Sequence, residues 1–374
     1  MCAEHVLGVD LGGSRCRALL ADTDGARHRT GQAPGGHPGS DPAAALAGIR
    51  RAVTAALEGT SPAAVRRVVL GAAGYAAVSA PSTAQALARV WASAGLRCPV
   101  RVRPDCEVAF AAGTSDPNGI VLVAGTGSMA ARIADRSMAG RAGGHGWMLG
   151  DEGSGFWLGR EAVRAALRVL ELGTAPSGDL VCRVLGEVLD QVEVLGGAAP
   201  ATDPLGTIGA ITTWVHREAP AGLAALAPLV LAAAQVGDAE ANGLLDRAAG
   251  LLADLALTLW RDGEPMVLAG ALLTASPIGT LVVDRLRAAG ASVHRSGEPV
   301  AGAAWLAVLD IWAIDPEAGD PAATHVRLIG AAEGQEQLSA SATSASGTSA
   351  GQELQRVRSG AADAAPDDRE ATLA

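Results

Sequence analysis

The sequence predicts an α/β protein made of two related halves, and three observations support this prediction. Residues 5–21 read as an apolar strand, a Gly-Gly turn and a second strand. Residues 119–134 repeat this strand-turn-strand unit directly after the turn signal Asp-Pro-Asn-Gly at 116–119. Helical patterns and further apolar strands follow each unit, as is typical of α/β domains.

Length and composition set the expected domain organisation. The chain has 374 residues, of which 49% are hydrophobic, so it can bury ample core and is long enough for two domains. We expect a first domain over 1–116, a larger second domain over 117–298 and a closing helix over 299–315. Residues 316–374 are rich in Ala, Ser, Gly and Thr, cannot bury enough apolar area to offset the chain entropy lost on ordering, and are expected to be a mostly disordered tail.

The remaining elements follow from local patterns. An Asp-Gly turn at 24–25 predicts a hairpin into a third strand. Further strands are predicted from the apolar run at 65–71, which ends in glycine, from PVRVRP at 99–104 and from the apolar run MVLAGALL at 266–273. Helices are predicted where apolar residues recur at helical spacing: 42–58, about 82–95, 106–113 and most of 155–262, with a break at 196–200.

Charge and residue usage exclude several classes of function. A formal net charge of −10 opposes binding to nucleic acid. The sequence contains no lysine, which excludes a P-loop lysine and Schiff-base chemistry. The five cysteines lack CxxC spacing, which argues against a disulfide framework and a zinc site. The longest apolar stretch, near 221–234, contains Pro228 and is too short to span a bilayer, so we expect a cytoplasmic protein without a membrane partner.

The first candidate binding motif is the turn Asp10-Leu11-Gly12-Gly13-Ser14 at a strand end. Gly12 and Gly13 let backbone N–H groups approach an anionic group closely, and Ser14 adds a hydroxyl. Asp10 is placed to hold Mg²⁺ through water. An ordinary hairpin turn is the alternative interpretation.

The second motif repeats the first at the end of the strand GIVLVA. Gly125-Thr126-Gly127-Ser128 adds two hydroxyls that can contact phosphoryl oxygens or an acceptor sugar. A carboxylate precedes it by about twenty residues: Asp105, at the end of PVRVRP. Phosphoryl transfer to a hydroxyl needs a carboxylate that accepts the hydroxyl proton, which makes Asp105 the candidate base. Its alternative role is to cap the helix at 106–113.

A glycine-dense loop at 143–160 is the most distinctive segment. It contains His145, Trp147, Asp151 and Glu152 and runs into a helix after Ser154. Carboxylates that accept paired sugar hydroxyls suit carbohydrate recognition, whereas capping of the following helix is the structural alternative.

A later glycine turn follows the strand MVLA. There, Gly270 and Ala271 would let adenine lie against bare backbone. The alternative is a simple turn from strand to helix.

The order of these motifs resembles the BadF/BadG/BcrA/BcrD-type ATPase family, in particular its N-acetylglucosamine kinase branch. The resemblance rests on DLGGS, PDCEVAFAAG, VLVAGTGS, GGHGWMLGDEGSGFWLG and VLAGALL, over about residues 5–315. It implies two actin-like (RNase-H-like) domains flanking an ATP and sugar cleft, domain closure on sugar binding, and a homodimer.

The resemblance also implies roles for single residues. Ser14 and Thr126 would contact ATP phosphates, and Asp105 would be the general base. Ala271 and Ala233 would flank the adenosine. The residues that would line the sugar are Ser128, Met129, Gly144, His145, Gly146 and Asp151. His37 stands where the family usually has a sugar-contacting asparagine, and His145 where a tryptophan is frequent.

The activity implied is ATP-dependent phosphorylation of an amino sugar, with N-acetylglucosamine converted to its 6-phosphate. Glucosamine, N-acetylmuramic acid and other amino sugars stay open. The family also contains ATPases that drive electron transfer into a partner enzyme through an iron-sulfur cluster, but Cys98 and Cys106 form no paired motif. A non-catalytic sugar sensor is the third alternative, against which Asp105 and the lack of a helix-turn-helix before the first strand argue.

Overall fold

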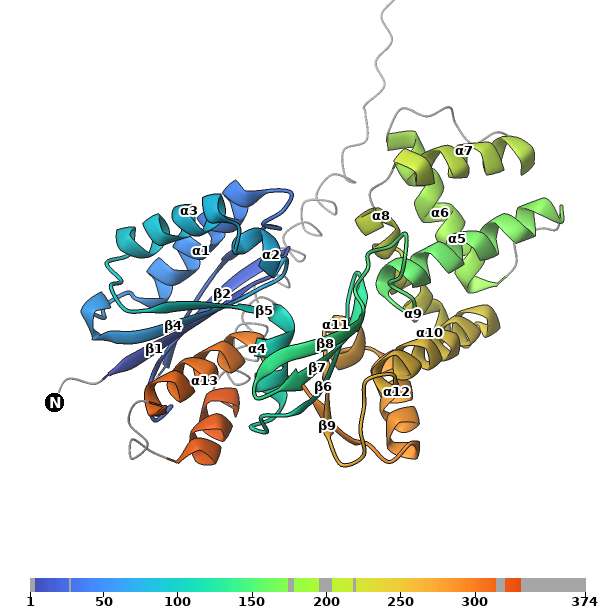
Figure 1. Ribbon diagram of the computed structural model, residues 1–374. Coiled ribbons are helices and arrows are strands. Elements are labelled where there is room, and N and C mark those ends of the chain that lie inside the picture. Colours follow the sequence, from blue (N-terminus) through green and yellow to red (C-terminus); the bar gives the residue numbers. More distant parts are fainter. Residues whose placement is uncertain are drawn as a thin grey trace, which may run out of the picture. The chain divides into compact units, whose positions relative to one another are not determined.

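The computed structural model describes residues 4–26, 28–173, 178–194, 204–217, 220–313 and 320–330. These residues contain two five-stranded sheets with helices packed on them (Figure 1). The helix break predicted at 196–200, residues 314–315 of the predicted closing helix and residues 331–374 of the predicted tail lie outside the described residues.

The first sheet is an antiparallel meander extended by two parallel strands. Its order is β3-β2-β1-β4-β5, in which β1 pairs antiparallel with β2 and parallel with β4. Its strands are β1 (His5–Leu11), β2 (Arg15–Asp22), β3 (His28–Pro34), β4 (Val65–Ala72) and β5 (Val100–Pro104). The parallel strands β1, β4 and β5 therefore end at the same edge of the sheet.

The second sheet repeats this topology. Its order is β10-β9-β6-β7-β8, with β6 antiparallel to β7 and parallel to β9. Its strands are β6 (Gly119–Ala124), β7 (Ser128–Ala134), β8 (Ser137–Gly143), β9 (Pro265–Ala269) and β10 (Ser292–Arg295). The predicted duplication of a strand-turn-strand unit is thus confirmed.

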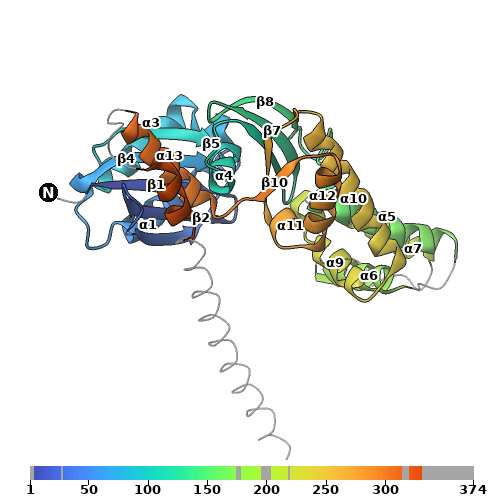
Figure 2. The same cartoon turned by 90° about the horizontal axis from the view of Figure 1, so that it is seen from below.

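Helices cover both faces of the first sheet. Figures 1 and 2 show α1 and α3 on one face and α13 on the other, although α13 comes from the far end of the chain. The helices of this part are α1 (Pro42–Ala56), α2 (Tyr75–Val78), α3 (Pro81–Ser93), α4 (Asp105–Gly113) and α13 (Pro299–Trp312), with a 3₁₀ turn at Pro62–Ala64. Helix α13 is apolar on all sides because it is packed between β1, β4 and α4.

The helices of the second part share one apolar core with one face of the second sheet. They are α5 (Gly155–Glu171), α6 (Asp179–Val194), α7 (Pro204–Arg217), α8 (Pro220–Ala224), α9 (Ala227–Gln235), α10 (Ala239–Leu257), α11 (Ala271–Thr274) and α12 (Pro277–Ala288). Ser154 begins α5 as predicted, since its Oγ accepts a hydrogen bond from Trp157 N at 3.3 Å.

Helix α4 packs against both sheets and against α13, and glycines make these contacts possible. A Cβ at Gly71 of β4 would lie 2.3 Å from Val108, and one at Gly113 would lie 2.4 Å from Val267 of β9. A Cβ at Gly302 of α13 would lie 2.0 Å from the carbonyl oxygen of Val108. Glycine is needed at all three positions, because an added Cβ would overlap a valine side chain at Gly71 and Gly113 and the backbone of α4 at Gly302.

The strand predicted over 266–273 is shorter than expected. Strand β9 ends at Ala269, and Ala271–Thr274 form a helical turn. Gly270 ends the strand because its φ is 90° and a Cβ there would lie 2.2 Å from the carbonyl oxygen of Ala124. The apolar run continues past this point because the helical turn is also buried, at Leu272 and Leu273.

Within the predicted tail, residues 321–330 form a helix, so the expected disorder does not apply to this stretch. In this helix, Thr324 and Leu328 are each only 1% exposed. His325 Nε2 donates to the carbonyl oxygen of Ala111 in α4 at 2.8 Å, and Arg327 Nε donates to that of Asp24 at 2.7 Å. The composition of this segment did not indicate a helix, because a few well-spaced side chains are enough to bury one helix face.

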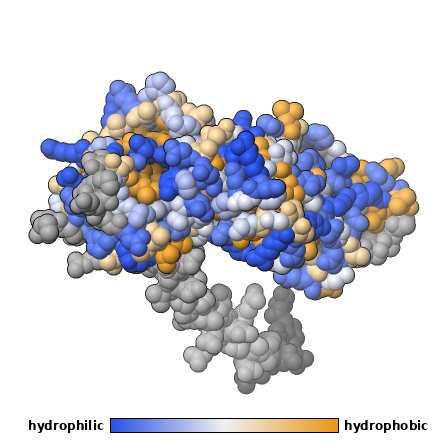
Figure 3. Space-filling model, turned by 60° about the horizontal axis from the view of Figure 1, so that its bottom comes forward, coloured by the Kyte–Doolittle hydropathy of each residue, from blue (hydrophilic) through white to orange (hydrophobic). Residues whose placement is uncertain are grey.

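The surface is mixed in character. Hydrophilic residues cover most of the face seen in Figure 3, and apolar residues appear there in separate small groups. Among the described helices, none is by itself long and apolar enough to cross a membrane. The bent pair Pro204–Arg217 and Gly222–Gln235 meets the length and composition criteria only when the two are taken together, across a 118° bend.

The packing of α4 predicts different effects for two glycine substitutions. Gly302→Ala is expected to lower the free energy of unfolding by about 3 kcal/mol, because the new methyl group overlaps Val108. Gly243→Ala in α10 has open space around the new methyl group. It should raise the free energy of unfolding by up to about 1 kcal/mol, because alanine favours helix. Urea unfolding measures both; equal effects would contradict the close packing of α13 on α4.

The helix at 321–330 predicts a second contrast. Leu328→Ala removes a buried side chain that lies against Gly25, and should cost about 2–4 kcal/mol. Val326→Ala, two residues away and 69% exposed, should change stability by less than about 0.5 kcal/mol. Thermal unfolding of the two variants compares them; an equally small effect of both would show that this helix does not pack on the first sheet in solution.

Candidate active site

Two carboxylates meet at one edge of the first sheet. Asp10 lies near the end of β1, and Asp105 follows β5 as the first residue of α4. These parallel strands flank β4, so both side chains lie at the carboxyl edge of the sheet. The structure assigns no side-chain cap to α4: Asp105 Oδ1 accepts from the next backbone N–H, that of Cys106, at 3.0 Å, and the residue's own backbone N–H also bonds the carboxylate. Helix capping therefore does not account for the Asp105 carboxylate.

Burial shapes the titration of both carboxylates. Burial raises the pKa of Asp10 to about 6. The positive charge of Arg17 lowers the pKa, the negative charge of Asp105 raises it, and Arg15 has a smaller lowering effect. Burial also raises the pKa of Asp105, against hydrogen bonds from backbone N–H groups. Arg17 lies opposite Asp10 on β2 and also pairs with Glu298 at the start of α13. The edge thus carries negative charge that its own arginines only partly compensate.

The turn after Asp10 leaves space beside its backbone. Gly12 N donates to Arg15 O at 2.9 Å, which closes the hairpin. Gly13 and Ser14 are exposed, and a Cβ at Gly13 would have no neighbour within 4 Å. An anionic group can therefore approach this turn, as the sequence predicted.

His37 lies in the loop after β3. Its ring is exposed, and Nδ1 accepts a hydrogen bond from Gly39 N at 3.2 Å. Nε2 lies close to Gly74, where an added Cβ would be 3.3 Å away. Gly74 follows β4, so the structure brings His37 to the same end of the sheet as Asp10 and Asp105.

The second glycine turn and the glycine-dense loop form one hydrogen-bonded unit. Gly155 N donates to Gly125 O at 2.8 Å, and Phe156 N donates to Thr126 O at 3.0 Å. Ser128 Oγ donates to Glu152 O at 2.9 Å. The sequence placed these two segments in the same site, and the structure joins them directly.

Asp151 completes this unit from an unusual backbone conformation. Its φ is 60°, and its Oδ1 accepts a hydrogen bond from Ser128 N at 3.0 Å. A Cβ at Gly127 would lie 2.7 Å from that same oxygen, so the turn needs glycine there. Thr126 remains exposed beside the bonded turn, where its hydroxyl is open to a ligand.

The preceding loop is bonded to this unit at its start, where Gly144 N donates to Ser128 O at 3.1 Å. Gly144 and Gly146 have φ of 67° and 78°, and Gly144 lies against Met129. His145 is exposed, as are Met148 at 75% and Leu149 at 81%. The Trp147 ring packs on Phe156 with 5.9 Å between centroids. The loop therefore presents an open, partly apolar surface beside the bonded turn.

Two predicted site residues have other partners in the structure. The Glu152 carboxylate is half-exposed and faces Arg160, with 3.4 Å between Oε2 and Nη2. Ala233 in α9 is fully buried in the core of the second part, and its side chain therefore cannot flank an adenosine. Ala271, by contrast, is exposed next to Gly270, at the end of the parallel strand β9.

The residues present fit a magnesium nucleotide. Among the described residues, no group of three or more His, Cys, Asp or Glu side chains could hold a metal ion. Mg²⁺ characteristically needs only one or two carboxylates when substrate phosphates and water complete its shell. The half-buried Asp10 carboxylate, with its raised pKa, is a charge that a cation would compensate. Gly13, Ser14 and Thr126 leave open backbone and hydroxyl groups for phosphate.

Sequence reasoning missed the polar network next to Asp105. Arg103 and Glu107 form an ion pair that holds the turn between β7 and β8. The only sequence signal was a pair of opposite charges four residues apart across the end of a strand, which is common on protein surfaces. Nothing in the sequence indicated that Glu107 would be only 6% exposed.

Comparison with known proteins gives a family match over most of the chain. The model of the BadF/BadG/BcrA/BcrD ATPase family matches residues 7–307. The N-acetyl-D-glucosamine kinase of Dictyostelium discoideum is 28% identical over 265 residues, which cover 68% of this chain and 79% of that protein. The N-acetylmuramic acid/N-acetylglucosamine kinase of Clostridium acetobutylicum is 41% identical over 64 residues, which span only 17% of this chain and 21% of that relative.

A solved structure shares the fold. The crystal structure of a candidate N-acetylglucosamine kinase from Chromobacterium violaceum aligns with a TM-score of 0.62 and 26% sequence identity. The alignment covers 82% of this chain and 99% of that one. This likeness confirms the predicted fold class.

Replacing Asp10 by Asn is expected to stabilise the ligand-free protein at neutral pH. Because folding raises the pKa of this carboxyl from 3.8 to about 6, its ionisation costs folding free energy as the pH rises through that window. The stability of the wild type should thus be undiminished only well below the unfolded-state pKa of 3.8, where the carboxyl is protonated in both states. We expect Asp10→Asn to gain about 2 kcal/mol over the wild type at pH 7.

Urea unfolding at pH 4 and pH 7 measures this difference. Most of the advantage of the variant should disappear at pH 4, which is close to the unfolded-state pKa of the carboxyl. An equal difference between wild type and variant at the two pH values would contradict the raised pKa.

Proposed function

The chain belongs to the BadF/BadG/BcrA/BcrD ATPase family, and from this premise we propose that it is a kinase that phosphorylates an amino sugar with ATP. The substrate we propose is N-acetylglucosamine, at its 6-hydroxyl. Two relatives named as kinases of this sugar, together with the likeness to the Chromobacterium violaceum structure, support the proposal. The observation that carries it is Asp105, a half-buried carboxylate at the carboxyl edge of the first sheet.

Asp105 acts in this proposal as the general base. It accepts the proton of the sugar hydroxyl while the hydroxyl oxygen bonds to the terminal phosphorus of ATP and the bond to the departing ADP oxygen breaks. Its raised pKa strengthens it as a proton acceptor. The backbone N–H of Cys106 holds one carboxylate oxygen and leaves the other for the hydroxyl.

The phosphate side is served by the two glycine turns. The exposed hydroxyls of Ser14 and Thr126 and the open backbone at Gly13 contact the phosphates of ATP. Asp10 would hold Mg²⁺ through water. When bound with ATP, this ion would neutralise phosphate charge during transfer. The adenine lies at Gly270 and Ala271, where the chain exposes little side chain.

The sugar side is served by the loop that is bonded to the second turn. Asp151 Oδ1 accepts a hydrogen bond from Ser128 N. In this proposal, Oδ2 of the same carboxylate accepts a hydrogen bond from a sugar hydroxyl. His145 and the backbone of Gly144 and Gly146 line the sugar from the exposed part of the loop. His37 contributes a ring nitrogen near the end of β4, in place of the amide that the family usually has. We further propose that the enzyme works as a cytoplasmic homodimer.

The cysteines do not favour the alternative of an ATPase with an iron-sulfur cluster. Cluster ligands are thiolates, and reactive thiols are accessible. Cys106 is 1% exposed, and burial, together with the charges of Asp105 and Glu107, raises its pKa to about 12. Its Sγ lies 3.8 Å from the sulfur of Met138. This thiol is therefore an apolar packing group.

Asp105→Asn tests the base. We expect sugar-dependent ADP release with ATP and Mg²⁺ to fall about 10²–10⁴-fold, because the amide cannot accept the proton. The panel contains N-acetylglucosamine, glucosamine, N-acetylmuramic acid and glucose, with N-acetylglucosamine expected to give the highest kcat/KM.

Asp41→Asn is the matched control. Asp41 caps α1 by accepting from Ala44 N at 2.9 Å, and asparagine caps equally well, so its activity should stay within about twofold of wild type. ATP hydrolysis that ignores every sugar, and that Asp105→Asn leaves unchanged, would overturn the proposed kinase activity.

A further inference from the structure

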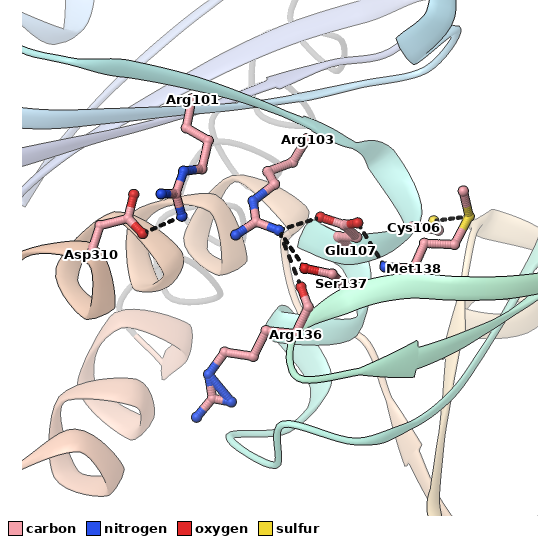
Figure 4. A network of polar contacts seen from close by, with 8 residues as sticks. All are labelled: Arg101, Arg103, Cys106, Glu107, Arg136, Ser137, Met138 and Asp310. Carbon is pink, nitrogen blue, oxygen red and sulfur yellow. Dashed lines mark hydrogen bonds and ion pairs between the residues drawn. The ribbon is translucent and has the colours of Figure 1, made fainter. Parts of the chain in front are cut away.

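Arg103 and Glu107 bracket the candidate base in sequence and pair across it. Arg103 lies in β5, two residues before Asp105, and Glu107 lies in the first turn of α4, two residues after it. Arg103 Nη1 donates to Glu107 Oε2 at 2.9 Å, and the side chains are 17% and 6% exposed. The pair therefore links the residues on either side of Asp105 in the chain, and Figure 4 shows the contact between Arg103 and Glu107.

The same pair holds the hairpin turn between β7 and β8 of the second sheet. Met138 N donates to Glu107 Oε1 at 2.8 Å, and Arg103 Nη1 donates to Ser137 Oγ at 3.0 Å (Figure 4). The turn itself is tight, with φ of 47° at Asp135 and 58° at Arg136. Each oxygen of the Glu107 carboxylate thus serves a different sheet, since Arg103 belongs to the first and Met138 to the second.

Strand β7 extends this connection to the other half of the site. It runs from Ser128, in the second glycine turn, to Ala134, next to the turn that Glu107 holds. Its pairing with β6 and β8 makes it a stiff element. Through β7, the Glu107 carboxylate therefore helps to fix the position of the second glycine turn, and it also fixes the first turn of α4.

Stability alone does not require such a pair. A buried ion pair contributes little net stability, because the cost of removing two charges from water offsets their attraction, and well-packed apolar residues often serve as well. What it supplies is fixed geometry through directional hydrogen bonds. Catalysis is sensitive to this, since a misplacement of about 1 Å can cost about 10²-fold in rate.

We propose that Glu107, held by Arg103, is a positioning residue that locks the first turn of α4 to the β7–β8 hairpin and so sets Asp105 in register with the second glycine turn. This inference rests on the proposed kinase function. It differs from a direct catalytic role, because Glu107 acts through Asp105 and both of its oxygens are occupied within the protein.

Glu107→Gln tests the inference by kinetics. The amide still accepts from Met138 N but cannot pair with the charge of Arg103. We expect kcat for the sugar to fall about 10–100-fold, while KM for ATP and sugar stays within about threefold, because binding groups are untouched. An unchanged kcat would overturn the proposal.

The double variant Arg103→Met/Glu107→Leu separates positioning from stability. It removes both charges and should regain most of the stability lost in Glu107→Gln. A positioning role predicts that kcat stays low despite this recovery. Return of kcat together with stability would show that the pair is merely structural and would overturn the inference.

Arg132→Met/Glu264→Leu is the matched control pair. Arg132 and Glu264 form an ion pair with side chains 16% and 19% exposed, between β7 and the start of β9. The control should change stability to a similar degree and leave kcat within about twofold of wild type. A fall in its kcat as large as that in the Arg103 and Glu107 double variant would also overturn the inference, because loss of any ion pair would then suffice.

Thiol labelling tests the lock without any substrate. Cys106 lies between Asp105 and Glu107 and is 1% exposed, so its alkylation by iodoacetamide reports opening of the first turn of α4. We expect Glu107→Gln to speed labelling of Cys106 at least about 10-fold, with Cys98 unchanged as internal reference. Unchanged labelling of Cys106 would overturn the lock itself. Faster labelling in a protein that phosphorylates no sugar would instead place the failure in the proposed function.

Discussion

The site depends on the close packing of helix α4 between two sheets and α13. Gly71, Gly113 and Gly302 bring backbone from three directions to within van der Waals contact of this helix or its neighbours. This contact prevents α4 from shifting, because a closely packed interior has no empty space into which the helix could move. Asp105 is the first residue of α4, so the packing that fixes the helix also fixes the backbone of Asp105. A carboxylate that must meet a hydroxyl within hydrogen-bond distance gains from a support of this kind.

Most of the fold could be predicted because its signals are local. Gly-Gly and Asp-Gly turns mark hairpins, and the recurrence of the strand-turn-strand unit revealed the duplicated sheet topology. The errors arose where tertiary contacts decide. Gly270 ends β9 because the carbonyl of Ala124 lies against it, which no local pattern shows. The helix at 321–330 forms from an unremarkable composition because the first sheet and α4 offer partners for Leu328 and His325.

The candidate site was predicted in its motifs but not in its connections. Asp10, Asp105 and the two glycine turns each follow a strand, so the topology places them at sheet edges without further information. The predicted place of Ala233 beside the adenosine does not fit its burial, which depends on the packing of α9 against distant helices. The partners of Glu107 and Glu152 were equally out of reach, since a carboxylate in sequence does not reveal which arginine or backbone N–H it faces.

The bonding of the glycine-dense loop divides it into two segments with different tolerance for change. Residues 151–156 are tied by hydrogen bonds to the turn at 125–128, so altering them disturbs the groups that we propose contact phosphate. Residues 145–149 are exposed and include His145, Trp147 and Met148; the bond to that turn is made just before them, from Gly144 N to Ser128 O. Grafting of this outer segment from a related enzyme is thus a route to altered sugar choice, in which the chemistry of transfer is inherited unchanged from the inner one.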